Sequence, residues 1–500
     1  MPSAYLLAID QGTTSTRAAI FNESGQCVGT ASREFRQMYP QPGWVEHDPN
    51  EILQTLVHVI PAALDQARIG ATDLTAIGIT NQRETVVLWD RASGQPVAPA
   101  IVWQDRRTAN FCKERKNDEP WLAERTGLVL DPYFSASKIR WLLQNDPSLR
   151  ARAEAGKLAV GTIDSWLLWN LTGGQVHATD MSNASRTLLL NLRTVQWDVD
   201  LCRFFDVPLA LLPTVQPSAS RFGVTSATPF LPAGIPILGV AGDQQSALFG
   251  QGGFAAGEAK CTYGTGAFFL LHTGETPIQS KHRLLTSLAA TIDATPKYVL
   301  EGSVFIAGAA VQWLRDGLHV IGQSSEVEAL AANSSADEPI VFVPGFVGLG
   351  APHWTPDVRG AIFGLTRNTS VADLARAVLE GVAFQVVDLI DAADRDIGRP
   401  LTDLRVDGGM AQNAWFLQRQ SDLLGRPVLP ALAHEATALG AAFLAGLQAG
   451  VWPNLDALRR LTQAGGRFDP TWDAATRTQK QSQWRHAVRT VIAYHSQKCP

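Results

Sequence analysis

Residues 5–21 read YLLAIDQGTTSTRAAIF, and this stretch decides the fold. An apolar run ends at Asp10, the segment Gly12-Thr13-Thr14 breaks it, and a second apolar run resumes at Ala18. Apolar runs separated by glycine and turn-forming residues are typical of strands joined by a tight connection. The stretch therefore predicts a strand, a turn and a returning strand.

The turn also carries a set of polar groups. Asp10 ends the first strand, and backbone N–H groups follow together with the hydroxyls of Thr13, Thr14 and Ser15. Such a set suits a phosphate group and a hydrated magnesium ion. No Gly-Lys-Ser/Thr follows, so this is not the lysine-containing phosphate loop. The alternative is a plain hairpin turn in which Asp10 and Thr13 bond only their own backbone.

The same order of residues recurs far downstream. Residues 259–263 lead into Gly264-Thr265-Gly266, and an apolar run resumes at 267–271. We interpret this recurrence as a duplication, in which two hairpins from two domains face each other and clamp the phosphate chain of a nucleotide. A plain glycine turn would explain the second copy if it stood alone.

Short β-rich runs alternate with helical stretches around each copy, which predicts the mixed α/β class. The expected strands are residues 76–80, 85–89, 340–343 and 404–406, and the expected helices are residues 52–68, 370–394 and 484–496. Prolines concentrate in residues 208–236, which we interpret as an irregular surface excursion. A boundary just after it gives expected domains of residues 1–250 and 251–500.

The composition of the 500 residues, 45% hydrophobic and 18% charged, is that of a folded globular chain. A net charge of −5 disfavours nucleic acid and an anionic membrane as partners. Five widely spaced cysteines and the lack of a basic leader favour free thiols in a reducing compartment, so we expect a cytoplasmic protein. Residues 436–455 carry no charge, but Pro453 and the many small residues indicate a buried helix and its exit loop rather than a membrane span.

Polar residues that could take part in binding or catalysis follow two of the apolar runs. Arg83 and Glu84 leave the sheet together at a strand end, where an arginine and a glutamate can grip a polyhydroxylated substrate from both hydrogen-bonding senses. An exposed ion pair is the alternative. Trp103 and Tyr133 are candidate walls for the same ligand, or ordinary core aromatics. Asp243 follows an apolar run and a glycine and leads into a helix that we expect to start near Ser246; it is a candidate general base, with a helix N-cap as its alternative.

Two glycine-containing stretches in the second half leave bare backbone where a base or a ribose could approach closely. Gly302 precedes a run that contains Gly308 and Gln312, and residues 407–413 (DGGMAQN) end one strand and open a helix. Close helix packing explains the first glycines equally well. The strand, Gly-Gly, helix order of the second stretch is more specific for a nucleotide.

Taken together, these motifs resemble the FGGY carbohydrate kinases of the actin and hexokinase fold superfamily, and among them the kinases of glycerol. The motifs that carry the resemblance are residues 81–84, 131–135, 242–249, 260–266 with Phe268, 347–354, 407–413 and 435–444. The resemblance implies a duplicated α/β fold of two ribonuclease H-like domains with the active-site cleft between them. It also implies transfer of phosphate from ATP, with Mg²⁺, to glycerol, which gives sn-glycerol 3-phosphate and ADP as the first step of glycerol catabolism.

The family motifs imply a role for each matching residue. Glycerol would be held by Arg83, Glu84, Tyr133, Asp243 and Gln244, with Trp103 and Phe268 against its carbon backbone. ATP would be contacted by Thr13, Thr14, Ser15, Thr265, Gly308, Gln312, Gly409 and Asn413, with Arg17 near the phosphates. Asp10 would hold the metal through water, with Asp243 as a second candidate metal residue; Asp243 is also the implied base.

Several alternatives stay open at this stage. The pocket could serve another polyol or a ketopentose, and a nucleotide-gated binding protein of the chaperone or actin type is the rival from another class. A homo-oligomer, dimer or tetramer, is compatible with the sequence. Some bacterial members carry a Gly-Gly-x-Arg-like loop for a sugar bisphosphate or a phosphorylatable histidine between residues 220 and 236, whereas this chain has Arg221 but neither feature. We therefore expect that familiar regulation is absent.

Overall fold

The predicted hairpin forms the centre of a sheet. The structure is a computed structural model that describes residues 4–334, 340–432 and 435–496. β1 (Tyr5–Gln11) pairs antiparallel with β2 (Ser15–Asn22) and parallel with β5 (Leu74–Asn81). With β3 (Cys27–Glu34), β13 (Ala219–Val224) and β14 (Pro236–Gly242), they form a six-stranded sheet of order β13-β14-β5-β1-β2-β3.

The second hairpin builds a second sheet on the same plan. β15 (Ala259–Tyr263) pairs antiparallel with β16 (Ala267–Gly274) and parallel with β21 (Leu404–Asp407). The six-stranded order is β17-β18-β16-β15-β21-β22, completed by β17 (Leu285–Leu288), β18 (Tyr298–Val304) and β22 (Val428–Pro430). The run β3-β2-β1-β5-β14 of the first sheet thus has the same pairing directions as β18-β16-β15-β21-β22 of the second. The predicted duplication is confirmed.

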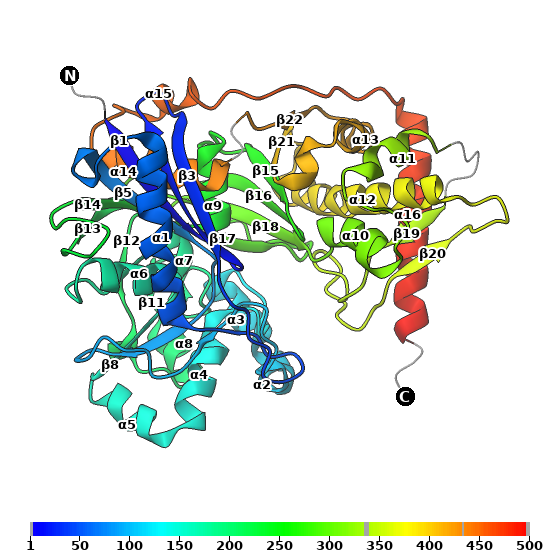
Figure 1. The fold of residues 1–500 in the computed structure, drawn as a ribbon. Coiled ribbons are helices and arrows are strands. Elements are labelled where there is room, and N and C mark those ends of the chain that lie inside the picture. Colours follow the sequence, from blue (N-terminus) through cyan, green and yellow to red (C-terminus); the bar gives the residue numbers. More distant parts are fainter. Residues whose placement is uncertain (1–3, 335–339, 433–434, 497–500) are drawn as a thin grey trace.

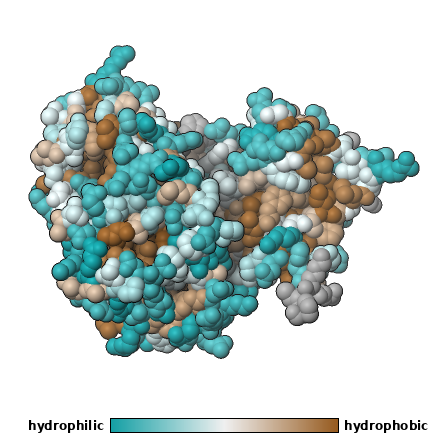
Figure 2. Space-filling view, turned by 60° about the horizontal axis from the view of Figure 1, so that its bottom comes forward, coloured by the Kyte–Doolittle hydropathy of each residue, from teal (hydrophilic) through white to brown (hydrophobic). Residues whose placement is uncertain are grey.

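Helices pack on both sheets. α1 (Pro49–Ala67) lies on the first sheet, and α12 (Val371–Ile397), α13 (Ala414–Leu424) and α16 (Ala474–Ser496) belong to the second lobe. Figure 1 shows the two lobes side by side, the first running from blue to green and the second from green to red, apart from an orange segment that returns to the first lobe. In the view of Figure 2 the surface is hollowed between them.

Two helices connect the lobes. α9 (Asp243–Gly250) follows the last inner strand of the first sheet, and α14 (Ala436–Gln448) returns from the second half to pack against β1, β5 and β14. A side chain at Gly440 would place its Cβ 1.9 Å from the carbonyl oxygen of Ser246, and one at Gly250 would lie 2.0 Å from that of Ala436. Glycine at both positions therefore lets the two helices cross in backbone contact.

The remaining elements are short and surround these layers. In the first lobe they are β4 (Glu46–His47), β6 (Val87–Asp90), β7 (Ala100–Ile101), α2 (Ala109–Glu114), α3 (Glu119–Thr126), α4 (Ser135–Asn145), α5 (Pro147–Glu154), β8 (Leu158–Gly161), α6 (Ile163–Leu171), β9 (Ala178–Asp180), α7 (Met181–Ala184), β10 (Leu190–Asn191), β11 (Gln196–Trp197), α8 (Val199–Phe204) and β12 (Thr214–Gln216). In the second half they are α10 (Gly308–Gln312), α11 (Glu326–Ala332), β19 (Val341–Val343), β20 (Ala361–Phe363) and α15 (Leu455–Arg459).

Three expectations about elements need comment. The interpretation of residues 208–236 as an irregular excursion is wrong in part, because β13 is an edge strand of the first sheet and buries Ala219 and Phe222. The C-terminal helix begins at Ala474, ten residues before the expected start, because its first turns are polar and give no apolar period. The segment 436–455 is α14 and its exit loop, as expected.

We propose a division of the chain into residues 1–250 and 251–500, since α9 ends the first unit and β15 opens the second sheet. This division is one of sequence only, because α14 belongs to the second unit by sequence and packs on the sheet of the first. Within the described ranges, no helix combines the length and the apolar composition needed to cross a membrane.

Candidate active site

The site is built around the end of β5. Gln82 donates its side-chain amide to the carbonyl of Gly12 at 3.0 Å, which ties this strand end to the first hairpin turn. Glu84 has φ of 62°, a left-handed conformation that is rare for residues other than glycine. Arg83 and Glu84 therefore stand in a turn after the end of β5 and do not continue the strand.

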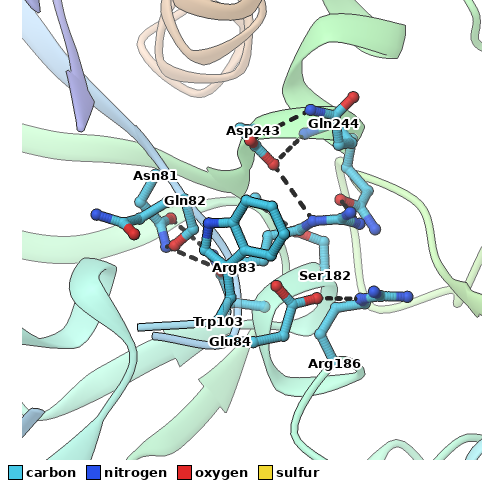
Figure 3. Close-up of polar contacts among 12 residues, drawn as sticks. Asn81, Gln82, Arg83, Glu84, Trp103, Ser182, Arg186, Asp243 and Gln244 are labelled. Atoms are coloured by element: carbon cyan, nitrogen blue, oxygen red, sulfur yellow. Dashed lines mark hydrogen bonds and ion pairs between the residues drawn. The ribbon is translucent and has the colours of Figure 1, made fainter. Parts of the chain in front are cut away.

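Arg83 and Glu84 are buried, with 3% and 1% of their surface exposed, so the alternative of an exposed ion pair is wrong. Arg83 Nε lies 3.3 Å from Asp243 Oδ1, and Arg186 Nε donates to Glu84 Oε1 at 2.6 Å. Figure 3 shows the two residues side by side, each with one such partner. Charged side chains are almost never fully buried unless they are paired.

Burial and the neighbouring charges act in opposite directions on the pKa of each residue of this pair. Burial raises the pKa of Glu84 above its usual range, although the guanidinium groups of Arg186 and Arg83 oppose the shift. Burial alone would lower the pKa of Arg83, but the carboxylates of Glu301 and Glu84 outweigh it and keep that pKa above its ordinary value. Arg83 thus stays a cation next to Glu84, and the nearby guanidinium groups favour the carboxylate form that burial disfavours.

Asp243 begins α9 directly after Gly242, its N-cap. Its carboxylate accepts from the backbone N–H of Gln244 at 2.7 Å and from the Gln244 side chain at 3.2 Å. A Cβ on Gly242 would lie 2.7 Å from Arg83 Cδ, so glycine there lets the arginine reach Asp243. The carboxylate therefore has a hydrogen bond at the helix start and a charge partner, and about 30% of its side chain stays exposed.

Three aromatic rings from both halves lie together near this pair. The Trp103 ring centroid is 5.5 Å from that of Tyr133 and 6.4 Å from that of Phe268 on β16. Trp103 Nε1 donates to Thr13 Oγ1 at 2.9 Å, which fixes the ring beside the first hairpin turn. Buried Lys138 donates to the carbonyl oxygens of Pro132, Tyr133 and Phe134 and holds that loop in place. The rings form an apolar wall between the two sheets.

The first hairpin turn presents Thr13, Thr14 and Ser15, none of which is buried. Arg17, opposite Asp10 on β2, forms an ion pair with Glu435 at the start of α14. Burial raises the pKa of Asp10 to about 7, with a further rise from the nearby Asp243 and an opposing effect of Arg17. A cation beside Asp10 would offset this burial of charge.

The donor set fits a magnesium ion held mainly by water and phosphate. Magnesium sites usually combine one or two carboxylates with several waters and the phosphates of a substrate. Asp10 and Asp243 lie near enough to influence each other's charge. Among the described residues there is no group of three or more His, Cys, Asp or Glu side chains arranged for a metal. The set therefore suits a hydrated ion and not a cage made only of protein ligands.

The candidate nucleotide residues of the second half surround the other hairpin turn. Gly308 N donates to Gly264 O at 3.0 Å, and the backbone N–H groups of Ala307 and Ala309 donate to Thr265 O. Gln312 ends the same short helix, α10. A Cβ on Gly408 would lie 2.3 Å from the carbonyl oxygen of Tyr263, so this glycine brings the next loop against β15.

Gly409 follows in that loop with open space around its Cα, and Asn413 caps α13 by accepting from Phe416 N at 2.8 Å. The candidate residues thus fall into two groups, one on each sheet. Through the described chain, no hydrogen bond or ion pair joins the Gly12–Thr14 turn to the Gly264–Gly266 turn. The ring contact between Trp103 and Phe268 connects the two groups.

Sequence reasoning missed a layer of buried charges behind these residues. Arg186, Glu301 and Lys260 are all at least 98% buried, and Lys260 Nζ donates to Gln244 Oε1 at 2.5 Å. Lys260 and Glu301 come from strands of the second sheet, and Arg186 follows α7. A lone charge inside an apolar run, such as Glu301 between Leu300 and Gly302, was the one available signal.

Comparison with known proteins identifies the family. The model of the FGGY family of carbohydrate kinases matches its N-terminal domain to residues 5–250 and its C-terminal domain to residues 259–449. The glycerol kinase of Allorhizobium ampelinum is 54% identical over 492 residues, which cover 98% of this chain and 99% of that protein. The glycerol kinase of Deinococcus radiodurans is 52% identical, with 97% of each chain covered.

Solved structures agree with this result. The crystal structure of Plasmodium falciparum glycerol kinase with ADP superposes with a TM-score of 0.92 at 38% identity and covers 98% of both chains. The gluconate kinase of Lactobacillus acidophilus shares the fold, with a TM-score of 0.89 at 21% identity over 99% of this chain and 100% of that one. On these matches, and with two sheets of the same plan that carry the family motifs, the chain belongs to the FGGY family of carbohydrate kinases.

Proposed function

We propose that this protein transfers the γ-phosphoryl group of ATP to glycerol, and releases sn-glycerol 3-phosphate and ADP. The observation that carries the proposal is the buried Arg83–Glu84 pair beside Asp243, which offers hydrogen-bond donors and acceptors next to a partly exposed carboxylate. The name of the relatives at 52–54% identity supports the same activity. A chaperone-like ATPase has no need of such a polyol clamp.

We propose a task for each group that this geometry supports. Arg83 and Glu84 bind the hydroxyls that are not phosphorylated, and the Trp103 wall contacts carbon. Asp243 accepts the proton of the terminal hydroxyl while its oxygen bonds to phosphorus and the bond to the ADP oxygen breaks. Burial of this site excludes water, which would otherwise compete as the acceptor.

The cofactors are ATP and Mg²⁺. We propose that Thr13, Thr14, Ser15 and Thr265 contact the phosphates together with Arg17, and that Gly308, Gln312, Gly409 and Asn413 contact the nucleoside. Backbone N–H groups of the two hairpin turns are suitable donors for phosphate oxygens. Asp10 would hold the metal through water, with Asp243 as its second carboxylate. When bound, the metal neutralises phosphate charge.

The compartment and the assembly are further proposals. Four cysteines of the described residues, Cys27, Cys112, Cys202 and Cys261, are free thiols, which supports a reducing compartment such as the cytoplasm. Cys499 lies outside the described residues. The net charge of −5 supports a small-molecule substrate and no nucleic-acid partner. A homo-oligomer, dimer or tetramer, is kept as a proposal.

A panel assay tests the function. ADP release is coupled to a spectroscopic readout, and glycerol, other polyols, ketopentoses, dihydroxyacetone and the two propanediols are compared by kcat/KM. A site whose buried polar groups lose their partner can reject an analogue that lacks one hydroxyl by about 10⁴- to 10⁵-fold, so glycerol should exceed both diols. Dihydroxyacetone, which keeps three oxygens, should be tolerated better. A ketopentose with the highest kcat/KM would replace glycerol as the substrate, and substrate-independent ATP hydrolysis would favour the chaperone-like rival.

A further inference from the structure

A charged pair lies behind the candidate substrate residues. Glu301, on β18 of the second sheet, places Oε2 at 2.7 Å from Arg83 Nη1. The same oxygen lies 3.4 Å from Arg186 Nη1. Arg186 in turn donates from Nε to Glu84, the contact visible in Figure 3. The order Arg83, Glu301, Arg186, Glu84 is therefore a chain of alternating charges.

All four side chains are buried, with no more than 3% of their surface exposed. Two cations face two anions, so no charge in the chain is left without an opposite neighbour. Burial would raise the pKa of Glu301, but the charges of Arg186 and Arg83 outweigh it and lower that pKa to about 2. The carboxylate is thus ionised throughout the range in which the enzyme would work.

Glu301 is itself fixed by groups of the second half and of α9. Ser287 on β17 donates to its Oε1, and Gln245 donates to the same oxygen at 3.3 Å. Gln245 also accepts from Arg83 Nη1 at 3.2 Å. Rigid partners on both sides leave little freedom to the carboxylate, and hence to the arginine that it holds.

Arg83 and Glu84 each use some of their polar side-chain atoms for protein partners and leave one atom without a hydrogen bond. Arg83 uses Nη1 and Nε for protein carboxylates and the Gln245 amide, while its Nη2 makes no hydrogen bond within the described residues. Glu84 uses Oε1 for Arg186, while Oε2 makes none within that part of the chain. One donor of Arg83 and one acceptor of Glu84 are thus left available for a ligand.

Packing alone does not account for an arginine at position 186. It is fully buried, and its Nη atoms make no hydrogen bond, although its guanidinium lies 5.2 Å from the Tyr133 ring centroid and 5.0 Å from that of Phe134. A buried arginine with free donors costs stability relative to an apolar residue of similar volume. Its contacts are with Glu84, Glu301 and Tyr133, the surroundings of the proposed substrate.

We infer that Glu301 and Arg186 are positioning residues that orient Arg83 and Glu84 for the substrate hydroxyls, with Glu301 contributed by the second sheet. The inference rests on the proposed function. Without the charge of Glu301, Arg83 and Arg186 become two buried cations that repel each other, and Arg83 loses the partner that fixes its orientation. Substrate recognition then suffers, while the nucleotide residues on the hairpins are untouched.

The test is steady-state kinetics of Glu301→Gln with glycerol and ATP varied separately. We expect KM for glycerol to rise roughly 10- to 100-fold, by analogy with the loss of a group that orients a metal-binding side chain, with KM for ATP within about twofold. The preference for glycerol over 1,2-propanediol should shrink, because Arg83 is no longer held for a hydroxyl. Arg186→Lys keeps the positive charge but loses the planar guanidinium that contacts both Glu84 and Glu301. It should likewise raise KM for glycerol and leave KM for ATP unchanged, because Glu84 loses its orienting partner.

A matched control separates positioning from stability. Glu380 on α12 is also buried between two arginines, with Arg376 Nε at 3.0 Å and Arg419 Nε at 3.2 Å, far along the chain from the clamp. Glu380→Gln should lower the thermal unfolding midpoint without a change in KM for glycerol. Glu301→Asp keeps the charge and should recover part of the loss, which also guards against a folding defect.

Two outcomes would overturn the inference. One is an unchanged KM for glycerol in folded Glu301→Gln; the other is an equal rise in KM for glycerol and ATP, matched by Glu380→Gln. If the parent enzyme does not phosphorylate glycerol but another polyol, the proposed function fails, and the same comparison is made with that polyol. The two failures are therefore distinguishable.

Discussion

Asp243 is the residue whose chemistry the proposed function depends on most. It keeps a partly exposed carboxylate beside Arg83 and at the start of α9. Asp243→Asn should keep one hydrogen-bond acceptor at this position but remove the proton acceptor, so kcat should fall roughly 10²- to 10⁴-fold while glycerol still binds. Steady-state kinetics and calorimetric titration of glycerol check this. Near-normal turnover of the variant would refute the assignment of Asp243 as the base.

At the residue scale, the sequence was informative for groups that face the ligand and silent for those behind them. Arg83, Glu84 and Asp243 stand at strand ends and helix starts, where a polar residue after an apolar run attracts notice. Arg186 and Lys260 carry no such mark. Their role depends on burial against side chains more than fifteen positions away, such as Gln244 for Lys260, and local pattern does not encode that contact.

At the scale of elements, the crossing of α9 and α14 depends on glycine. A methyl group at Gly440 would lie 1.9 Å from Ser246 O, which is backbone and has little freedom to move. Overpacking of this kind costs about 1–3 kcal/mol, whereas alanine gains at most about 1 kcal/mol in helix propensity. Gly440→Ala should therefore lower the thermal unfolding midpoint.

Gly70→Ala is the control for that measurement. The nearest side-chain atoms to its added methyl group would be 3.5 Å away, an ordinary contact, and its φ of −87° suits any residue. The two variants should thus differ clearly in stability. Equal midpoints would show that the helices can separate at no cost, and that the close crossing does not constrain the lobes.

The segment after β13 carries a prediction about regulation. Thr225 N donates to Ile235 O and Gly234 N donates to Thr225 O, each at 2.9 Å, so the turn is closed by its own backbone. Arg221, which is exposed, is the one cationic side chain between residues 220 and 236. A ligand without differential affinity for two conformations shifts nothing. Fructose 1,6-bisphosphate should leave kcat and KM unchanged, and inhibition that disappears in Arg221→Ala would contradict this.

At the scale of the whole molecule, the duplication was predictable and the arrangement of the lobes was not. Two short motifs, each an apolar run, a glycine turn and a second run, were enough to predict two related sheets. The packing of α14 on the first sheet was not predictable, because the sequence of residues 436–448 indicates a buried helix but not which sheet it packs against. Long-range packing of this kind depends on shape complementarity between distant segments.

The last prediction concerns closure of the lobes. The candidate nucleotide groups are divided between the two halves, with Thr13 to Ser15 on the first sheet and Thr265 on the second, and no hydrogen bond joins the two hairpin turns in the described ranges. A cavity of about 740 Å³ also lies between the two sheets and is lined in part by residues 24–27, 429–432 and 460–464. Closure would rotate the lobes about the contacts that join them, which include α9, α14 and the buried Arg83–Glu301 ion pair, and such a pivot is the arrangement of hinge closure.

Glycerol together with a non-hydrolysable ATP analogue should therefore reduce the radius of gyration measured by X-ray scattering. A site that closes on its substrate excludes water, so ATP hydrolysis without glycerol should be much slower than turnover with it. Glycerol alone should have a smaller effect, because both sheets must be engaged to draw the lobes together. If the radius of gyration and the ATPase rate were both independent of glycerol, the substrate would not drive closure. Such a result would favour the chaperone-like alternative, against which the buried Arg83–Glu84 pair now argues.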